Sequence, residues 1–99
     1  MAVRRCSQKL PRKEWIECLA EGDWPASKLE PGKGTAYHRE IAGCHVFYMR
    51  DHNNPNVWTY HIDSNEKYSE MDGWSDRKFD TETEVKFALM NRLADGLGK

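Results

Sequence analysis

Three short segments in the middle of the chain, rich in aromatic and β-branched residues, constrain the fold more than any other feature. They span residues 37–41, 44–50 and 57–62. Ala42-Gly43 separates the first two segments, and the turn-forming sequence HNNPN separates the second from the third. Strand-like segments joined by such short connections pair as antiparallel neighbours. The sequence therefore predicts a three-stranded antiparallel β-meander.

A fourth short strand is expected after the third. Asp72-Gly73 is a hairpin turn signal, and we place the strand near 69–71 or near 75–79. The whole meander then spans 35–79.

An N-terminal helix is predicted before the meander. Pro11 presets the backbone for a first helical turn, Gly22 is a natural stop, and the apolar residues between them recur at helical spacing. We expect a helix over 11–22. Residues 23–34 hold two prolines and two glycines, which predicts a loop with one short helical turn after Pro25.

A second helix is predicted at the C-terminal end of the chain. Thr81-x-x-Glu84 is a capping box, in which the Thr81 hydroxyl accepts a hydrogen bond from the amide of Glu84. An apolar stripe follows at helical spacing, formed by Val85, Ala88, Leu89 and Leu93. We expect an amphipathic helix over 81–95, packed on one face of the sheet.

These elements make one α+β domain over residues 1–99, with a basic arm at 1–10. Its 38% hydrophobic residues, which include four Trp, four Tyr and three Phe, can form a core. The first residues lack the apolar stretch of a secretory signal, and no apolar run approaches the ~20 residues of a membrane-spanning helix. Cys6, Cys18 and Cys44 are odd in number and include no C-x-x-C pair. We therefore expect reduced thiols, with Cys18 and Cys44 as small buried residues, a cytoplasmic location and no membrane partner.

The two connections predict the strand register. A two-residue turn at Ala42-Gly43 places Glu40 opposite His45 and His38 opposite Phe47. A five-residue loop then places Phe47 opposite His61 and His45 opposite Asp63.

Alternation along the strands sorts the side chains onto two faces. The predicted core face, on which the C-terminal helix should lie, carries Tyr37, Ile41, Cys44, Val46, Tyr48, Trp58, Tyr60 and Ile62. The predicted outer face carries His38, Glu40, His45, Phe47, Met49, Val57, Thr59, His61 and Asp63.

The outer face allows three interpretations. The first is an ordinary polar face, either solvated or half-covered by the first helix or a loop. The second is a contact surface, because aromatic and Met residues ringed by charge are typical of partner-binding patches. The third is a metal or acid–base site that uses His38, His45 and His61. Because imidazoles change charge near neutral pH, we expect any binding through this face to depend on pH.

No sequence motif indicates catalysis. The chain contains no phosphate-binding loop, dinucleotide fingerprint or nucleophile elbow, and its glycines lie where turns need them. We expect a non-enzymatic protein without a cofactor.

The sequence Phe79-Asp80-Thr81 between a strand and a helix resembles AP2-like and integrase N-terminal DNA-binding domains. The resemblance implies a three-stranded sheet laid in the major groove of DNA. The predicted outer face departs from that pattern, because it carries His and acids rather than Lys and Arg. Nucleic-acid binding through the basic arm is therefore the alternative function, and its residues are Arg4, Arg5, Lys9, Arg12 and Lys13.

The chain divides into a basic first half and an acidic second half, although its net charge is only −1. An aromatic-rich domain of this size with an acidic half, a basic arm and no catalytic motif resembles the small inhibitor and adaptor proteins of phages and mobile elements, including anti-CRISPR and anti-restriction proteins. That resemblance implies binding to a host nucleic-acid-processing or defence complex. The acidic run at 63–84 could imitate a phosphate backbone, or simply keep an exposed loop and helix start solvated.

We therefore predict a small protein-binding module. A second copy of the chain is also compatible with the sequence as the partner. The predicted contact residues are Glu40, His45, Phe47, His61, Asp63, Glu66, Glu70, Asp72 and Asp76.

Overall fold

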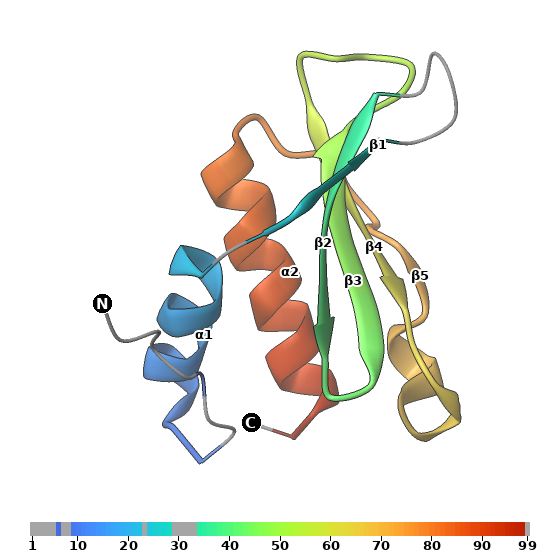
Figure 1. Ribbon diagram of the computed structural model, residues 1–99. Coiled ribbons are helices and arrows are strands. Elements are labelled where there is room, and N and C mark those ends of the chain that lie inside the picture. Colours follow the sequence, from blue (N-terminus) through green and yellow to red (C-terminus); the bar gives the residue numbers. More distant parts are fainter. Residues whose placement is uncertain (1–5, 7–8, 23, 29–33, 99) are drawn as a thin grey trace.

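The computed structural model describes residues 6, 9–22, 24–28 and 34–98. In chain order the elements are α1 (Arg12–Glu21), β1 (Ala26–Lys28), β2 (Thr35–Ile41), β3 (Cys44–Arg50), β4 (Trp58–Asp63), the 3-10 helix η1 (Glu66–Met71), β5 (Gly73–Trp74) and α2 (Glu82–Gly96). The strands form one antiparallel sheet in the order β1-β2-β3-β4-β5 (Figure 1). The predicted α+β fold, with a meander between two helices, is confirmed.

Both helices lie on the same side of the sheet (Figure 1). Helix α2 packs against β3 and β4, and α1 packs against α2. The largest fully buried side chains come from both layers and include Trp15, Tyr48, Ile62, Leu89 and Leu93. The first helix therefore lies away from the outer face of the sheet. This arrangement removes the interpretation in which the first helix covers the histidines.

Polar contacts cap the start of α2 and attach it to the sheet. The Thr81 hydroxyl accepts a hydrogen bond from the Glu84 amide at 3.1 Å, as the capping box predicts. The Tyr48 hydroxyl donates to Glu82 Oε1 at 2.8 Å. Burial raises the pKa of Tyr48, and the hydrogen bond and negative charge of Glu82 raise it further.

This contact predicts a loss of stability in alkali. The folded chain holds the Tyr48 proton more tightly than the unfolded chain, so its contribution is complete below the ordinary tyrosine pKa of roughly 10 and is lost as the pH rises above it. In urea unfolding above about pH 10, the free energy of unfolding should fall more steeply for the wild type than for Tyr48→Phe. Tyr68→Phe, at a half-buried tyrosine of η1, is the control. Equal slopes for wild type and Tyr48→Phe would contradict the prediction.

The edge strands correct two expectations. After Pro25 the chain forms β1 rather than a helical turn, and Ala26 pairs with Tyr37 of β2. The amide of His38 also donates to the Pro25 carbonyl at 3.0 Å. Pairing with a distant strand satisfies these backbone groups, and a local reading of the sequence does not include that pairing.

The predicted fourth strand lies between the two expected positions. Residues 69–71 belong to η1, and β5 is the pair Gly73–Trp74, which pairs with β4. Farther along, Phe79 makes a single bridge to Trp58. Gly73 has a φ of 125°, a conformation that glycine adopts most readily, so the chain leaves η1 and enters the sheet edge at this residue.

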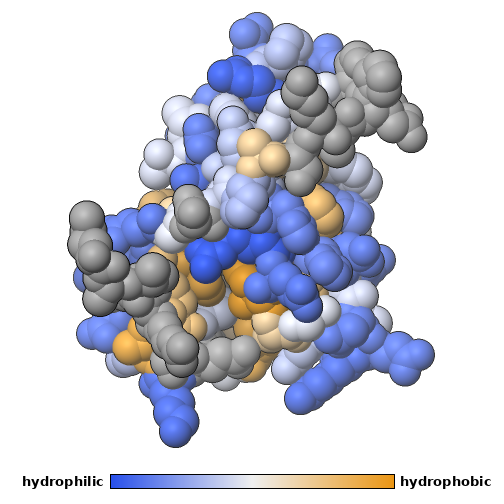
Figure 2. Space-filling model, viewed as in Figure 1, coloured by the Kyte–Doolittle hydropathy of each residue, from blue (hydrophilic) through white to orange (hydrophobic). Residues whose placement is uncertain are grey.

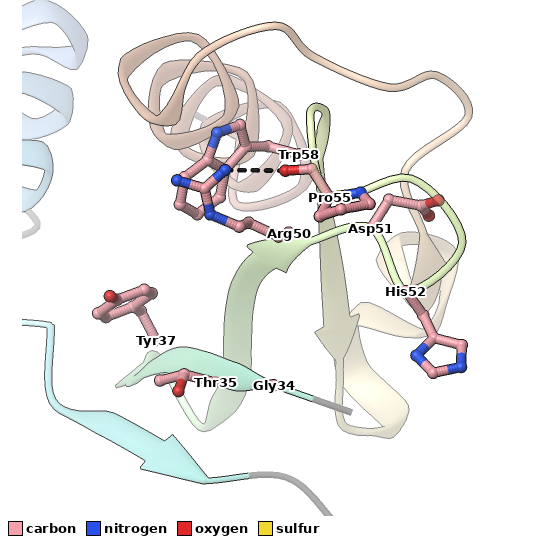
Figure 3. A pocket seen from close by; sticks show the side chains of 8 residues that line it. All are labelled: Gly34, Thr35, Tyr37, Arg50, Asp51, His52, Pro55 and Trp58. Carbon is pink, nitrogen blue, oxygen red and sulfur yellow. Dashed lines mark hydrogen bonds between the residues drawn. The ribbon is translucent and has the colours of Figure 1, made fainter. Parts of the chain in front are cut away.

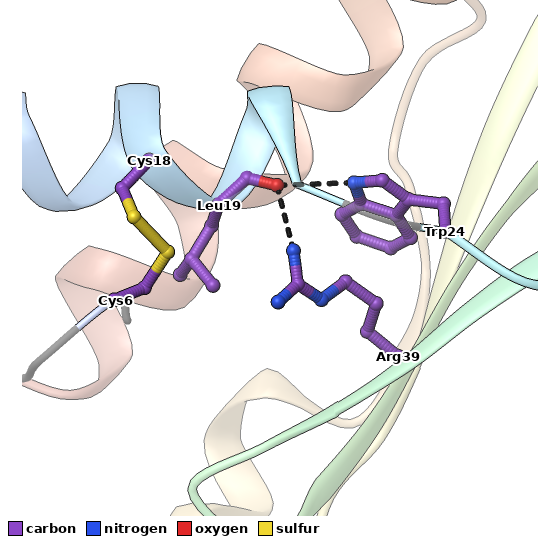
Figure 4. The surroundings of a disulfide bond; sticks show 5 residues. All are labelled: Cys6, Cys18, Leu19, Trp24 and Arg39. Atoms are coloured by element: carbon purple, nitrogen blue, oxygen red, sulfur yellow. Dashed lines mark hydrogen bonds between the residues drawn. A yellow bond between two sulfur atoms is a disulfide. The ribbon is translucent and has the colours of Figure 1, made fainter. Parts of the chain in front are cut away.

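The expectation of reduced thiols is wrong for two of the three cysteines. Cys6 and Cys18 form a disulfide, whereas Cys44 is free and buried, as expected (Figure 4). The chain turns at Lys9 and Leu10, which brings Cys6 back beside α1. A reversal of this kind between residues 12 positions apart has no local sequence signal. The disulfide also removes the support that reduced thiols gave to a cytoplasmic location.

The disulfide predicts one free thiol per chain. Thiol titration of denatured protein that was purified without reductant should detect Cys44 alone, and a value of three would contradict the pairing. Because closing a loop of this length restricts the unfolded chain, Cys6→Ser with Cys18→Ser should lower the free energy of unfolding by about 2–3 kcal/mol. Reductant should lower the stability of the wild type but leave that of the double variant unchanged.

The helix side of the molecule shows hydrophobic residues at the surface. In the view of Figure 2, hydrophobic colour gathers in the lower half, where Figure 1 shows α1 and α2. Phe87 of α2 is 38% exposed. Across the described residues, every helix is too short or too polar to cross a membrane.

Candidate functional site

The turn between β2 and β3 sets the arrangement of the outer face. Ala42 and Gly43 have φ values of 53° and 80°, the conformation of a two-residue hairpin turn. This turn places Glu40 opposite His45 and His38 opposite Phe47. On the next pair of strands Phe47 lies opposite His61, and His45 opposite Asp63. The predicted register is confirmed for both pairs of strands.

Four aromatic rings lie side by side across the outer face, one from each of β2, β3, β4 and β5. They belong to His38, Phe47, His61 and Trp74, and we call them the aromatic row. Neighbouring ring centroids are 4.6 Å apart for His38 and Phe47, 6.2 Å for Phe47 and His61, and 4.6 Å for His61 and Trp74. The spacing is that of aromatic pairs in contact, so the row is one continuous surface.

The aromatic row is open at the Trp74 end. The Trp74 side chain is 62% exposed, whereas His38, Phe47 and His61 are half-buried. Farther along the outer face Met49 and Thr59 are buried, and the Thr59 hydroxyl lies 2.8 Å from that of Ser75. The accessible part of the outer face is therefore centred on the row.

A second row of polar side chains borders the aromatic row. It consists of Glu40, His45 and Asp63, all exposed. His45 Nδ1 lies 2.9 Å from His38 Nε2, and the two rings are stacked. A hydrogen bond between imidazoles needs one donor and one acceptor nitrogen, so this pair can hold its contact only while at least one ring is neutral.

The alternative metal site would need His38, His45 and His61 to lie close enough together to hold one ion. The ring of Phe47 lies between His38 and His61 in the row. In the part of the chain that the structure describes, no three His, Cys, Asp or Glu side chains gather where they could hold a metal ion. The histidines instead line a stacked aromatic surface.

Of the four remaining acids of the predicted contact set, three share a hollow with Trp74. Glu66 and Glu70 are exposed on η1. Asp72 accepts a hydrogen bond from the Ser64 amide at 3.1 Å, which gives it a structural role as well. Glu70, Asp72 and Asp76 line, together with Trp74, a hollow of about 190 Å³.

Tyr60 of β4 and Arg92 of α2 also line that hollow. Burial raises the pKa of Tyr60, and the negative charge of Asp76 adds to the shift. The guanidinium of Arg92 donates to the backbone carbonyl oxygen of Glu70 at 2.9 Å. The hollow therefore has one cation at its wall and three acids.

The described basic residues of the alternative function lie on α1 or just before it, not in the aromatic row. Arg4 and Arg5 lie outside the described residues. Lys9 is exposed before α1, and Lys13 is exposed on it. Arg12 is part of α1 rather than of an arm, and its Nη1 lies 2.6 Å from Asp95 Oδ1 of α2. The structure thus engages one of these cations between the helices, on the side of the sheet away from the row.

Searches of protein-family models, of curated proteins and of solved structures each found no match to this chain. The functional assignment therefore rests on the geometry of its own side chains.

Trp74 is the residue of the row that sequence reasoning missed. The predicted strand was placed at 69–71 or at 75–79, on either side of it. A signal was present, because a large aromatic residue directly follows the Asp72-Gly73 turn. Its alignment with His61, however, comes from the pairing of β5 with β4.

Proposed function

We propose that this chain is a small non-enzymatic protein-binding module, which uses the aromatic row and its flanking acids to bind a positively charged protein surface. The observation that carries the proposal is the exposure of Trp74, 62%, at the end of a continuous row of rings.

An exposed aromatic row favours protein binding for a physical reason. Among the described residues, Trp74 and Phe87 are the exposed large hydrophobic side chains. Leaving such a ring in water forgoes the free energy of its burial, and contiguous exposed apolar groups mark interaction surfaces. Tryptophan is also among the residues that contribute most to binding energy at protein interfaces.

The charge around the row favours a basic partner. Glu40 and Asp63 are exposed beside it, and Glu70 and Asp76 line a hollow together with Trp74. These acids would repel the phosphates of a nucleic acid. Lys and Arg side chains of a partner would form ion pairs with the carboxylates and cation–π contacts with the rings. Proteins that bind nucleic acid present such basic surfaces, so an inhibitor of a host nucleic-acid-processing or defence complex fits this arrangement.

Two further predictions stay open to test. Nucleic-acid binding through the basic arm stays the alternative, and Arg12, one of its described cations, is already paired with Asp95. A cytoplasmic location stays a prediction, and the disulfide favours an oxidising environment instead.

The first test compares two exposed aromatic residues. The partner is a basic protein that the wild type captures and that is then purified. Trp74→Ala should weaken binding to this partner by about thirtyfold or more, because the ring lies at the proposed contact. Phe87→Ala, on the helix side, should change affinity by less than about threefold. Thermal unfolding should show both variants folded, with the larger loss of stability for Phe87→Ala, whose side chain is 38% exposed against 62% for Trp74. Full affinity in Trp74→Ala, or selective capture of duplex DNA, would contradict the proposal.

The second test is the pH dependence of the same complex. The affinity should fall several-fold from about pH 7.5 to about pH 5.5, because protonation of an imidazole at the contact adds positive charge against a positive partner. The double variant His45→Gln with His61→Gln should have a flatter profile. His52→Gln, at an exposed histidine of the β3–β4 loop, should keep the wild-type profile. Tighter binding at the lower pH would contradict the proposal that the partner surface is positively charged.

A further inference from the structure

A separate cavity lies at the end of the sheet where β2 begins and β3 ends. Its volume is about 340 Å³, and its wall includes Thr35, Tyr37, Arg50, Pro55 and Trp58 (Figure 3). Tyr37 and Trp58 belong to the core face, so the cavity does not share the aromatic row. Its size lies at the lower end of the range for small-molecule sites.

One wall is an aromatic ring held in place. The rings of Tyr37 and Tyr48 are stacked, with centroids 4.9 Å apart and planes 17° from parallel. Tyr48 is itself buried and hydrogen-bonded to Glu82. The Tyr37 ring is thus oriented before any ligand arrives, which lowers the entropy cost of binding.

The opposite wall carries a positioned cation. The Arg50 guanidinium lies over the ring of Trp58, 4.7 Å from its centroid. Its Nη1 donates to the Pro55 carbonyl oxygen at 2.8 Å (Figure 3). A guanidinium has five N–H donors in one plane, so this bond leaves several for a ligand. Such a fork matches the oxygens of a carboxylate or phosphate.

The nearby acid does not cancel this charge. Asp51 Oδ1 is 2.8 Å from Lys78 Nζ, and the hydrogen bond from Lys78 lowers the pKa of the Asp51 carboxyl. The carboxylate is thus neutralised by its own cation. In Figure 3 it points away from the ring of Tyr37. Asp51 and His52 also line the cavity, and among its described lining residues Arg50 is the one that carries a permanent positive charge.

From these observations we propose that the cavity binds a small planar anion, an aromatic ring that carries a carboxylate or phosphate group. The ring lies against Tyr37, and the charged oxygens accept hydrogen bonds from Arg50. This site is independent of protein binding through the aromatic row.

The test is an NMR titration of the ¹⁵N-labelled full chain with benzoate and with phenyl phosphate. Either anion should shift the Thr35 amide and the Trp58 indole N–H saturably and leave the Trp74 indole unchanged. Benzyl alcohol supplies a ring without charge, and acetate and inorganic phosphate supply charge without a ring. Each of these controls should bind at least about tenfold more weakly, because each lacks one of the two contacts. Whichever of benzoate and phenyl phosphate binds more tightly shows whether the site prefers a carboxylate or a phosphate.

Two variants assign the binding to the guanidinium. Arg50→Gln should lower the affinity for the tighter-binding anion about tenfold. The affinity of Arg50→Lys should lie between those of Arg50→Gln and the wild type, since lysine keeps the charge but loses the planar fork. Arg77→Gln is the matched control, because Arg77 also lies over an aromatic ring, 4.5 Å from the centroid of Phe79. Arg77→Gln should bind the anion within about twofold of the wild-type affinity. The absence of a saturable shift at Trp58, equal binding of benzyl alcohol, or full affinity in folded Arg50→Gln and Arg50→Lys would overturn the proposal.

Discussion

The two-residue turn at Ala42 and Gly43 is the constraint on which the rest of the molecule depends. Successive side chains of a strand point to opposite faces, so a slip of one residue would exchange the core face and the outer face. With this turn, Val46 and Tyr48 face the helices, and Phe47 faces outward. The turn favours glycine at its second position, because the φ of Gly43 is 80°. Both the core and the aromatic row follow from the register that it sets.

The placement of both helices on one side of the sheet gives the molecule two different surfaces. Helix α1 packs on α2, and the Arg12–Asp95 ion pair and the Cys6–Cys18 disulfide add contacts to that side. In the described part of the chain neither α1 nor α2 lies over the outer face, which leaves Trp74 and the neighbouring acids exposed. A sheet of this kind, apolar on one face and polar on the other, is common in antiparallel folds. The unusual part is the row of four rings that interrupts the polar face.

The aromatic row and the Arg50 cavity differ in the charge that they favour. The row is bordered by carboxylates, whereas the cavity presents a guanidinium whose acidic neighbour, Asp51, is paired with Lys78. Both use rings that are held by their neighbours: Trp74 by His61, and Tyr37 by Tyr48. Because strands point alternate residues to opposite faces, one sheet can carry two such surfaces without sharing a side chain.

Short-range signals made much of this structure predictable. The bounds of β3, the register of β2, β3 and β4, and the cap at Thr81 depend on residues a few positions apart, and each was read from the chain alone. The same signals placed three members of the aromatic row, His38, Phe47 and His61, on one face.

Other features were decided only by the tertiary structure. The edge strands β1 and β5 are two or three residues long and exist because longer neighbours satisfy their backbone groups. The disulfide depends on a chain reversal before α1, and the openness of the outer face depends on the side of the sheet that α1 occupies. Each of these brings together residues far apart along the chain, and a local pattern cannot encode that proximity. Amino-acid order therefore determined the faces of the sheet, and long-range packing decided which face was left uncovered.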